Sequence, residues 1–137
     1  MSALLQKLVL FFMSILAFFG MLKGNAKPAA GDYEVQKTAV VFALRSNPTT
    51  GYSWDVKISG DAVVLSSSDY RQDPGAPNMA GRGGTEYFTL TAVKPGAATA
   101  TFSYLRPWEG GPIETRVAEL VVDKDLNVTV RSFTEAP

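Results

Sequence analysis

The sequence predicts an all-β protein, an immunoglobulin-like β-sandwich of about seven strands preceded by an N-terminal signal peptide. Three observations lead to this fold class. Short stretches after Tyr33 alternate apolar and polar residues with a period of two, turn-forming residues separate these stretches, and nothing after residue 26 shows the 3.6-residue apolar period of an amphipathic helix. The length of 137 residues favours a single domain.

Three strands are expected in the first half of the domain. Residues 38–45 are apolar enough to be covered on both faces of a sheet, and residues 52–58 alternate so that Trp54 lies on the apolar, core-facing side. Residues 62–70 form a third strand, which three consecutive serines at positions 66–68 make less regular. Ser59-Gly60-Asp61 supplies the turn between the second strand and the third.

The second half of the domain adds four strands. Residues 85–93 alternate threonines with Phe88 and Leu90, residues 98–105 carry Phe102 on one face, and residues 113–123 are rich in valine. The last piece, residues 127–133, is predicted to pair at the edge of a sheet. Tight-turn residues at 94–97 and 124–125 separate these strands.

The N-terminus has the layout of a secretory signal peptide. Lys7 precedes an apolar run at residues 8–19, and Gly24-Asn25-Ala26 offers small residues for cleavage. A spanning helix needs roughly 20 apolar residues, so this run is short for a membrane anchor. We therefore expect a signal peptide at 1–26 and a domain at 27–137, exported through the secretory pathway to an extracellular, periplasmic or vesicular location and without a membrane attachment after cleavage.

The composition excludes several kinds of chemistry. The chain has no His and no Cys, so it cannot build a Ser-His-Asp or Cys-His catalytic pair or the usual nitrogen and sulfur ligand set of a zinc site. Basic and acidic residues number 13 each, which gives none of the positive excess that nucleic-acid binding needs. We expect no catalytic residue, no metal, no cofactor and no nucleic acid.

Three loop-type segments lie between the predicted strands, and each holds residues that a simple turn does not need. They are Asn47-Pro48-Thr49-Thr50-Gly51-Tyr52, Gly81-Arg82-Gly83-Gly84 and Arg106-Pro107-Trp108. Two strands separate each segment from the next. Because consecutive antiparallel strands reverse direction, all three segments should emerge at one end of the sandwich, with the tight turns at the other end.

The residues within these segments allow a plain and a functional interpretation. Pro48 and Gly51 alone indicate a well-formed turn, whereas the stiff pair Thr49 and Thr50 favours a preorganised contact surface. The glycines at 81, 83 and 84 indicate either a flexible hairpin or a backbone that a partner can approach closely. Trp108 lies in a loop, and exposed Trp and Arg are frequent interface hot spots.

Taken together, the three segments resemble those of the chagasin-like family of inhibitors of papain-type cysteine peptidases. The resemblance covers about residues 35–123 and has the three motifs in the family's order. It implies an immunoglobulin-like sandwich that inserts three loops (47–52, 79–84 and 106–111) into the peptidase active-site cleft as a reversible, tight-binding competitive inhibitor. Thr49 and Thr50 would cover the catalytic cysteine, and Trp108 would pack on the primed side.

The resemblance also implies which residues bind the peptidase and what the protein is not. The expected peptidase-binding residues are Asn47, Pro48, Thr49, Thr50, Gly51 and Tyr52, then Met79, Ala80, Gly81, Arg82, Gly83 and Gly84, then Arg106, Pro107 and Trp108. The partner would be a papain-like cysteine peptidase, bound by a monomer that is not itself an enzyme. The alternative is an exported immunoglobulin-like adhesion or carbohydrate-binding module, in which Trp108 would stack on sugars.

Overall fold

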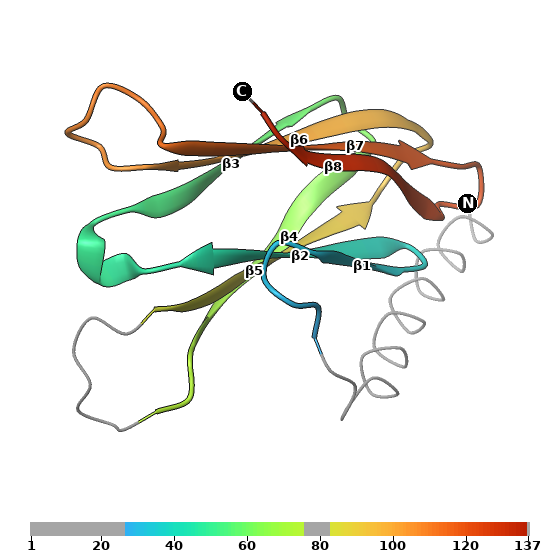
Figure 1. Cartoon of the computed structure of the whole chain (residues 1–137). Helices are drawn as coiled ribbons and strands as arrows, with labels where there is room; N and C mark the ends of the chain where they lie inside the picture. The colour runs from blue at the N-terminus through green and yellow to red at the C-terminus, as the bar shows by residue number, and fades with distance from the viewer. Residues whose placement is uncertain (1–26, 76–82, 137) are drawn as a thin grey trace.

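Eight strands in two four-stranded antiparallel sheets make up the part of the chain that the computed structural model describes, residues 27–75 and 83–136 (Figure 1). The first sheet has the order β1-β2-β5-β4, and the second has the order β3-β6-β7-β8. The strands are β1 (Tyr33–Gln36), β2 (Ala39–Ser46), β3 (Ser53–Ser59), β4 (Val63–Gln72), β5 (Gly84–Ala92), β6 (Gly96–Leu105), β7 (Glu114–Val122) and β8 (Val128–Glu135), with one 3-10 turn, η1 (Pro48–Thr50), between β2 and β3. The predicted all-β sandwich is confirmed.

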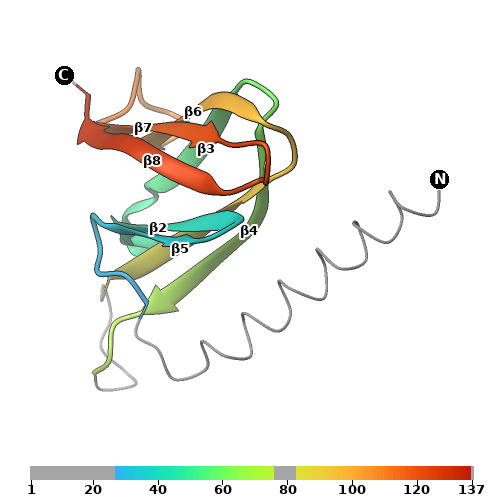
Figure 2. The same cartoon turned by 90° about the vertical axis from the view of Figure 1, so that its right-hand side faces the viewer.

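The two sheets pack face to face, as the end-on view in Figure 2 shows. The seven predicted strands are all present, with ends that differ by at most two residues, and β8 pairs with β7 at a sheet edge as expected. The serine run does disturb β4, whose register to β5 shifts between Leu65 and Ser67. The short strand β1, which pairs with β2, was not among the predicted strands.

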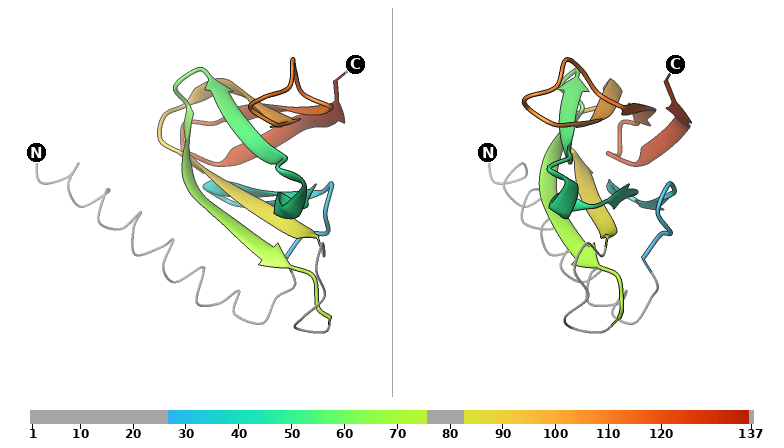
Figure 3. Two further views of the ribbon diagram at one scale, coloured as in Figure 1. Left: turned by 90° about the vertical axis from the view of Figure 1, so that its left-hand side faces the viewer. Right: turned by 60° about the vertical axis from the view of Figure 1, so that its left-hand side comes forward.

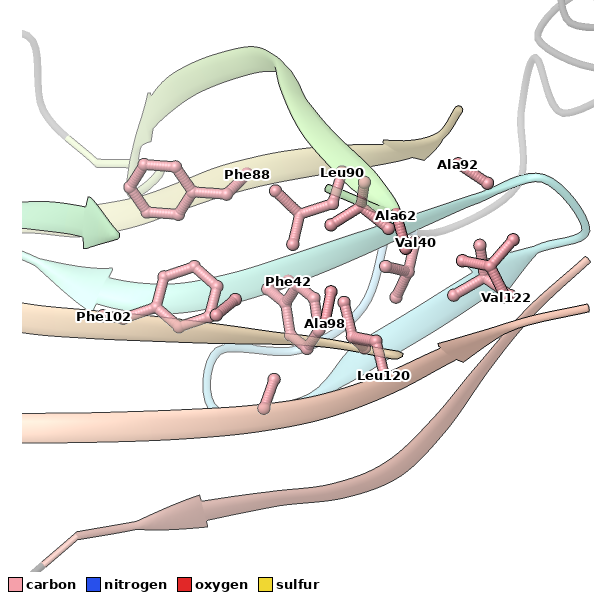
Figure 4. Close-up of a cluster of buried hydrophobic side chains, with 14 of the residues drawn as sticks. Val40, Phe42, Ala62, Phe88, Leu90, Ala92, Ala98, Phe102, Leu120 and Val122 are labelled. Carbon is pink, nitrogen blue, oxygen red and sulfur yellow. The ribbon is translucent and has the colours of Figure 1, made fainter. Parts of the chain in front are cut away.

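The core lies between the sheets and is built from the inward residues of both. Phe102 of β6 is fully buried, and its ring centroid lies 5.2 Å from that of Phe42 on β2 and 5.6 Å from that of Phe88 on β5 (Figure 4). Trp54 is buried in this core, as its alternating strand predicts. Burial of these large apolar side chains is the main driving force for the fold.

The connections between strands sort to two ends of the sandwich. The 3-10 turn and the connection between β6 and β7 lie at the left of Figure 1, and the β1–β2 and β7–β8 turns lie at the right. Figure 3 brings the left-hand end forward. We call residues 47–52 the first loop, the connection between β4 and β5 the second loop, and residues 106–111 the third loop. All three leave the same end, because each follows a strand that runs in that direction.

Residues 1–26, where the signal peptide is predicted, lie outside the described residues, as do residues 76–82 and 137. Within 27–75 and 83–136, no helix is long and apolar enough to cross a membrane.

Candidate functional site

The first loop is a single 3-10 turn closed by its own side chains. Asn47 caps the turn, because its Oδ1 accepts hydrogen bonds from the Thr49 hydroxyl at 2.6 Å and the Thr49 N–H at 3.3 Å. The Thr50 hydroxyl donates to the Asn47 carbonyl oxygen at 2.7 Å. Pro48 fixes its own φ at the first helical position. Pro48 and both threonines are exposed, so the loop presents a tip that is rigid before any partner arrives.

Tyr104 of β6 supports the first loop from beneath. Its hydroxyl oxygen accepts a hydrogen bond from the Asn47 N–H at 2.9 Å. Its ring is stacked on that of Tyr52, with centroids 5.2 Å apart, and lies 4.8 Å from the ring of Trp54. Tyr104 was not among the predicted site residues. The signal that could have found it is its inward position on the alternating strand that carries Phe102, next to the loop end.

The third loop folds over the first. The Arg106 guanidinium lies 4.3 Å from the centroid of the Tyr52 ring, and its Nη1 donates a hydrogen bond to the Thr50 carbonyl oxygen at 3.3 Å. Trp108 leans toward Gly51, where an added β-carbon would lie only 2.6 Å from the indole Cη2. Gly51 also has φ +83°, a conformation that favours glycine. Gly51 is therefore required both by the turn and by the tryptophan above it.

Glu109 connects the two loops electrostatically. One carboxylate oxygen forms an ion pair with Arg106, and the other accepts a hydrogen bond from the Tyr52 hydroxyl at 2.8 Å. The hydrogen bond from Arg106, followed by that from Tyr52, lowers the pKa of Glu109 below its ordinary value of 4.5. The bond to Glu109 in turn raises the pKa of Tyr52. We call these three residues the Tyr52–Arg106–Glu109 cluster.

The sequence placed Tyr52 and Arg106 among the binding residues, whereas Glu109 lay within the predicted loop 106–111 but was not named as a binding residue. In the structure Tyr52 and Arg106 are both half-buried and face each other, so their main contacts are within the protein. Trp108 is the residue that faces outward, with 71% of its surface exposed. The signal in the sequence that could have found Glu109 is its spacing of three residues from Arg106. In the structure a backbone hydrogen bond of 3.1 Å from the Glu109 N–H to the Arg106 carbonyl oxygen closes this turn.

The two ends of the second loop, next to β4 and β5, lie within the described residues, and we call them its stem. Gly84 is the first residue of β5 and is buried, and a β-carbon there would lie 2.2 Å from the Arg71 carbonyl oxygen. Gly84 therefore permits the close approach of β4 rather than exposing backbone to solvent. Gly83 lies beside the first loop, since a β-carbon on it would lie 3.6 Å from Cβ of Asn47.

A side-chain pair holds this stem closed. The Arg45 guanidinium at the end of β2 binds Asp73 in a two-pronged ion pair, with a distance of 2.9 Å between Nη1 and Oδ1. The Asp73 N–H donates to the Gly83 carbonyl oxygen at 3.0 Å. Neither Arg45 nor Asp73 was predicted as part of the site. Four predicted residues of this loop, namely Met79, Ala80, Gly81 and Arg82, lie outside the described residues.

The chemistry available at this end is that of binding. The exposed side chains at the tips of the first and third loops are Pro48, Thr49, Thr50, Pro107 and Trp108, none of them charged. The carboxylate of Glu109 is already engaged by two partners. Residues 27–75 and 83–136 contain no group of three His, Cys, Asp or Glu residues that could hold a metal ion. The surface offers a stiff, largely uncharged edge with an exposed indole.

Comparison with known proteins agrees with this geometry. The family model described as "Chagasin family peptidase inhibitor I42" matches residues 34–122, a span that includes all three motifs. The chain belongs to the chagasin family. Strand β8 lies beyond the span matched by the chagasin family model.

Individual chagasin-family relatives show the same likeness. The chain is 32% identical to Amoebiasin-2 of Entamoeba histolytica, over 61% of this chain and 69% of that protein. It is 33% identical to Chagasin of Trypanosoma cruzi, over 52% of this chain and 67% of that protein. The crystal structure of a cysteine protease inhibitor from Entamoeba histolytica superimposes with a TM-score of 0.54 at 29% identity, covering 61% of this chain and 77% of the other.

Proposed function

We propose that this protein is a reversible, tight-binding competitive inhibitor of papain-like cysteine peptidases. As a member of the chagasin family it is a peptidase inhibitor and not an enzyme. The observation that carries the mechanism is the union of the first and third loops into one preorganised surface, in which Trp108 lies against Gly51 and Arg106 joins the loops. The family match favours inhibition over an adhesion or carbohydrate-binding module.

Each loop has a separate task in this proposal. Thr49 and Thr50, at the tip of the first loop, cover the catalytic cysteine of the peptidase. Residues 79–83 of the second loop lie along the non-primed side and pair through their backbone. Trp108 of the third loop packs against an apolar wall on the primed side. The three loops fill the cleft without presenting a bond in position for cleavage.

The internal hydrogen bonds of the first loop support tight binding. Because Asn47 and both threonine hydroxyls are bonded within the loop, little conformational entropy remains to be lost when a partner binds. The uncharged tips also avoid the cost of burying an unpaired charge in the interface. Affinity is then expected to depend on a few anchors, with Trp108 as the largest.

The direct test is a titration of papain with the purified protein, followed by the hydrolysis of a small fluorogenic substrate. Competitive inhibition raises the apparent KM and leaves kcat unchanged at saturating substrate. Full inhibition near equimolar amounts is expected for a tight complex. An absence of inhibition of papain and of a panel of papain-like peptidases at micromolar protein would overturn the proposed function.

Export and oligomeric state are part of the same proposal. We propose that residues 1–26 are removed as a signal peptide on export through the secretory pathway, to an extracellular, periplasmic or vesicular compartment, and that the mature protein acts as a monomer. N-terminal sequencing of the exported protein should begin at Lys27. Light scattering should give the mass of one chain, and a stable dimer would contradict the monomer.

A further inference from the structure

Glu109 joins two segments that are far apart in the sequence. Its Oε2 accepts a hydrogen bond from the Tyr52 hydroxyl, 57 positions earlier in the chain, and its Oε1 pairs with Arg106 in its own loop. Among the described residues, Arg106 and Tyr52 are the charged and titratable side chains that face this carboxylate. Its charge is therefore balanced by a single cation.

Arg106 transmits this contact to the binding surface. Its guanidinium lies 4.3 Å from the centroid of the Tyr52 ring and 5.5 Å from that of the Trp108 ring, and it also donates to the Thr50 carbonyl oxygen. Only about a third of either side chain of the pair is exposed, 29% for Arg106 and 30% for Glu109. The Nε atom of Arg106 is buried and has no hydrogen-bond partner among the described residues. The cation thus carries a desolvation cost that the Glu109 carboxylate offsets.

Loss of the carboxylate charge would leave Arg106 half-buried without a counter-ion. A half-buried cation in that position gains by moving out into water. Trp108 would then lose the cation beside its ring, and Thr50 would lose the hydrogen bond to its carbonyl. The third loop would no longer be held against the first, so Trp108 would become mobile and a partner would have to order it on binding.

We propose that Glu109 is a positioning residue of the inhibitory surface, which in its ionised form holds the first and third loops together through Arg106, so that inhibition weakens when this carboxylate is neutralised. The proposal rests on the proposed function and adds a regulation of the same surface by acidity. The lowered pKa of Glu109 supports it and sets the direction. The surface stays assembled through mild acid and comes apart as the pH falls through the folded-state pKa, below 4.5.

The test compares Glu109→Gln with Glu119→Gln, since Glu119 is an exposed glutamate on β7 outside the loops. We expect the inhibition constant for papain near neutral pH to rise about tenfold in Glu109→Gln, mainly through faster dissociation, and to stay at the wild-type value in Glu119→Gln. Urea midpoints equal to that of the wild type exclude a folding defect. Equal inhibition constants for the wild type and Glu109→Gln would overturn the positioning role.

A second readout needs no peptidase. In the nuclear magnetic resonance spectrum, the indole N–H signal of Trp108 should shift with acid in the wild type, with a midpoint below 4.5, and should not shift in Glu109→Gln. The buried Trp54 provides an internal reference. An unmoved Trp108 signal in the wild type, or the same shift in Glu109→Gln, would overturn the proposal. Failure of the wild type itself to inhibit would instead overturn the proposed function.

Discussion

Two carboxylates at opposite ends of the sandwich use the same chemistry for different purposes. At the loop end, Glu109 reaches across to a tyrosine 57 positions away. At the far end, Asp123 accepts hydrogen bonds from the N–H groups of Asp125 and Asn127 at 2.8 and 2.9 Å, within its own turn. The pKa of Glu109 is lowered by its hydrogen bonds from Arg106 and Tyr52, and that of Asp123 by its hydrogen bonds from the Asn127 and Asp125 N–H groups. One carboxylate orders two loops relative to each other, and the other closes a single turn.

The difference shows that, of these two sites, the loop end depends on polar contacts between segments far apart in the sequence. The bonds that close the β7–β8 turn are local in the sequence, since they join the Asp123 carboxylate and backbone to residues no further away than Asn127. The first and third loops would each be a simple turn alone, and they become one surface through Arg106, Glu109 and the Gly51–Trp108 contact. Substitutions at the loop end should therefore change inhibition, and those at the far end should change stability.

The largest expected effect comes from the middle of the sandwich, on which both ends depend. Phe102→Ala should lower the free energy of unfolding by roughly 3–5 kcal/mol, because it opens a cavity beside Phe42 and Phe88. Urea denaturation measures this change. Val64→Ala, at a side chain that is 46% exposed, is the control and should change stability little. Similar losses in the two variants would contradict the packing described for the core.

Trp108→Ala should separate inhibition from stability. We expect binding to papain to weaken by roughly 2 kcal/mol or more, which is about thirtyfold in the inhibition constant. The urea midpoint should not change, since most of the indole surface is exposed. An unchanged inhibition constant would remove Trp108 from the binding surface.

Asp123→Ala should show the opposite pattern. Removing the carboxylate leaves the Asp125 and Asn127 N–H groups without their acceptor, so the melting temperature should fall, by less than in Phe102→Ala. The inhibition constant should stay at the wild-type value. Asp125→Ala, which keeps both N–H donors, is the matched control. If Asp123→Ala inhibited more weakly and kept its melting temperature, the assignment of inhibition to the loop end and stability to the far end would be wrong.

Acidity should affect stability through the same aspartate. Because its folded-state pKa is lowered from 3.8, Asp123 contributes stability that is present above 3.8 and is lost as the pH falls through the folded value. Asp123→Asn keeps an acceptor oxygen but has no charge to titrate. Urea midpoints measured between neutral pH and strong acid should fall less steeply in Asp123→Asn than in the wild type. Parallel curves would show that the contribution is absent.

The smallest effect is expected at the exposed ion pair between Lys94 and Asp61. This pair also joins two segments far apart in the sequence, with a distance of 2.9 Å, but 61% and 77% of the two side chains are exposed. Solvent and salt screen such a pair. Lys94→Met should leave both the melting temperature and the inhibition constant within experimental error. A clearly lower melting temperature or a clearly higher inhibition constant would mean that ion pairs between distant segments contribute at both ends of the sandwich.

The sequence was enough to predict the strands, the two-ended arrangement of the turns and the burial of Trp54, because alternation and turn residues are local signals. Strand β1 was not predicted because the tight turn after it uses Lys37 at φ 62°, a position where glycine or asparagine usually marks a hairpin in the sequence. Tyr104 and Glu109 were not predicted as site residues for a different reason. Their partners Asn47 and Tyr52 are each 57 positions away, and only the strand registers bring them together.

The coupling of the two loops has a consequence for anyone who would transplant them. A first loop moved alone into another sandwich would arrive without the arginine that binds its Thr50 carbonyl, and a third loop moved alone would find no tyrosine for its glutamate. The unit that can be grafted is therefore the pair of loops, with Tyr52, Arg106 and Glu109 transferred together. Chimeras that respect this pairing should retain the donor's selectivity, and those that divide it should lose affinity for every target.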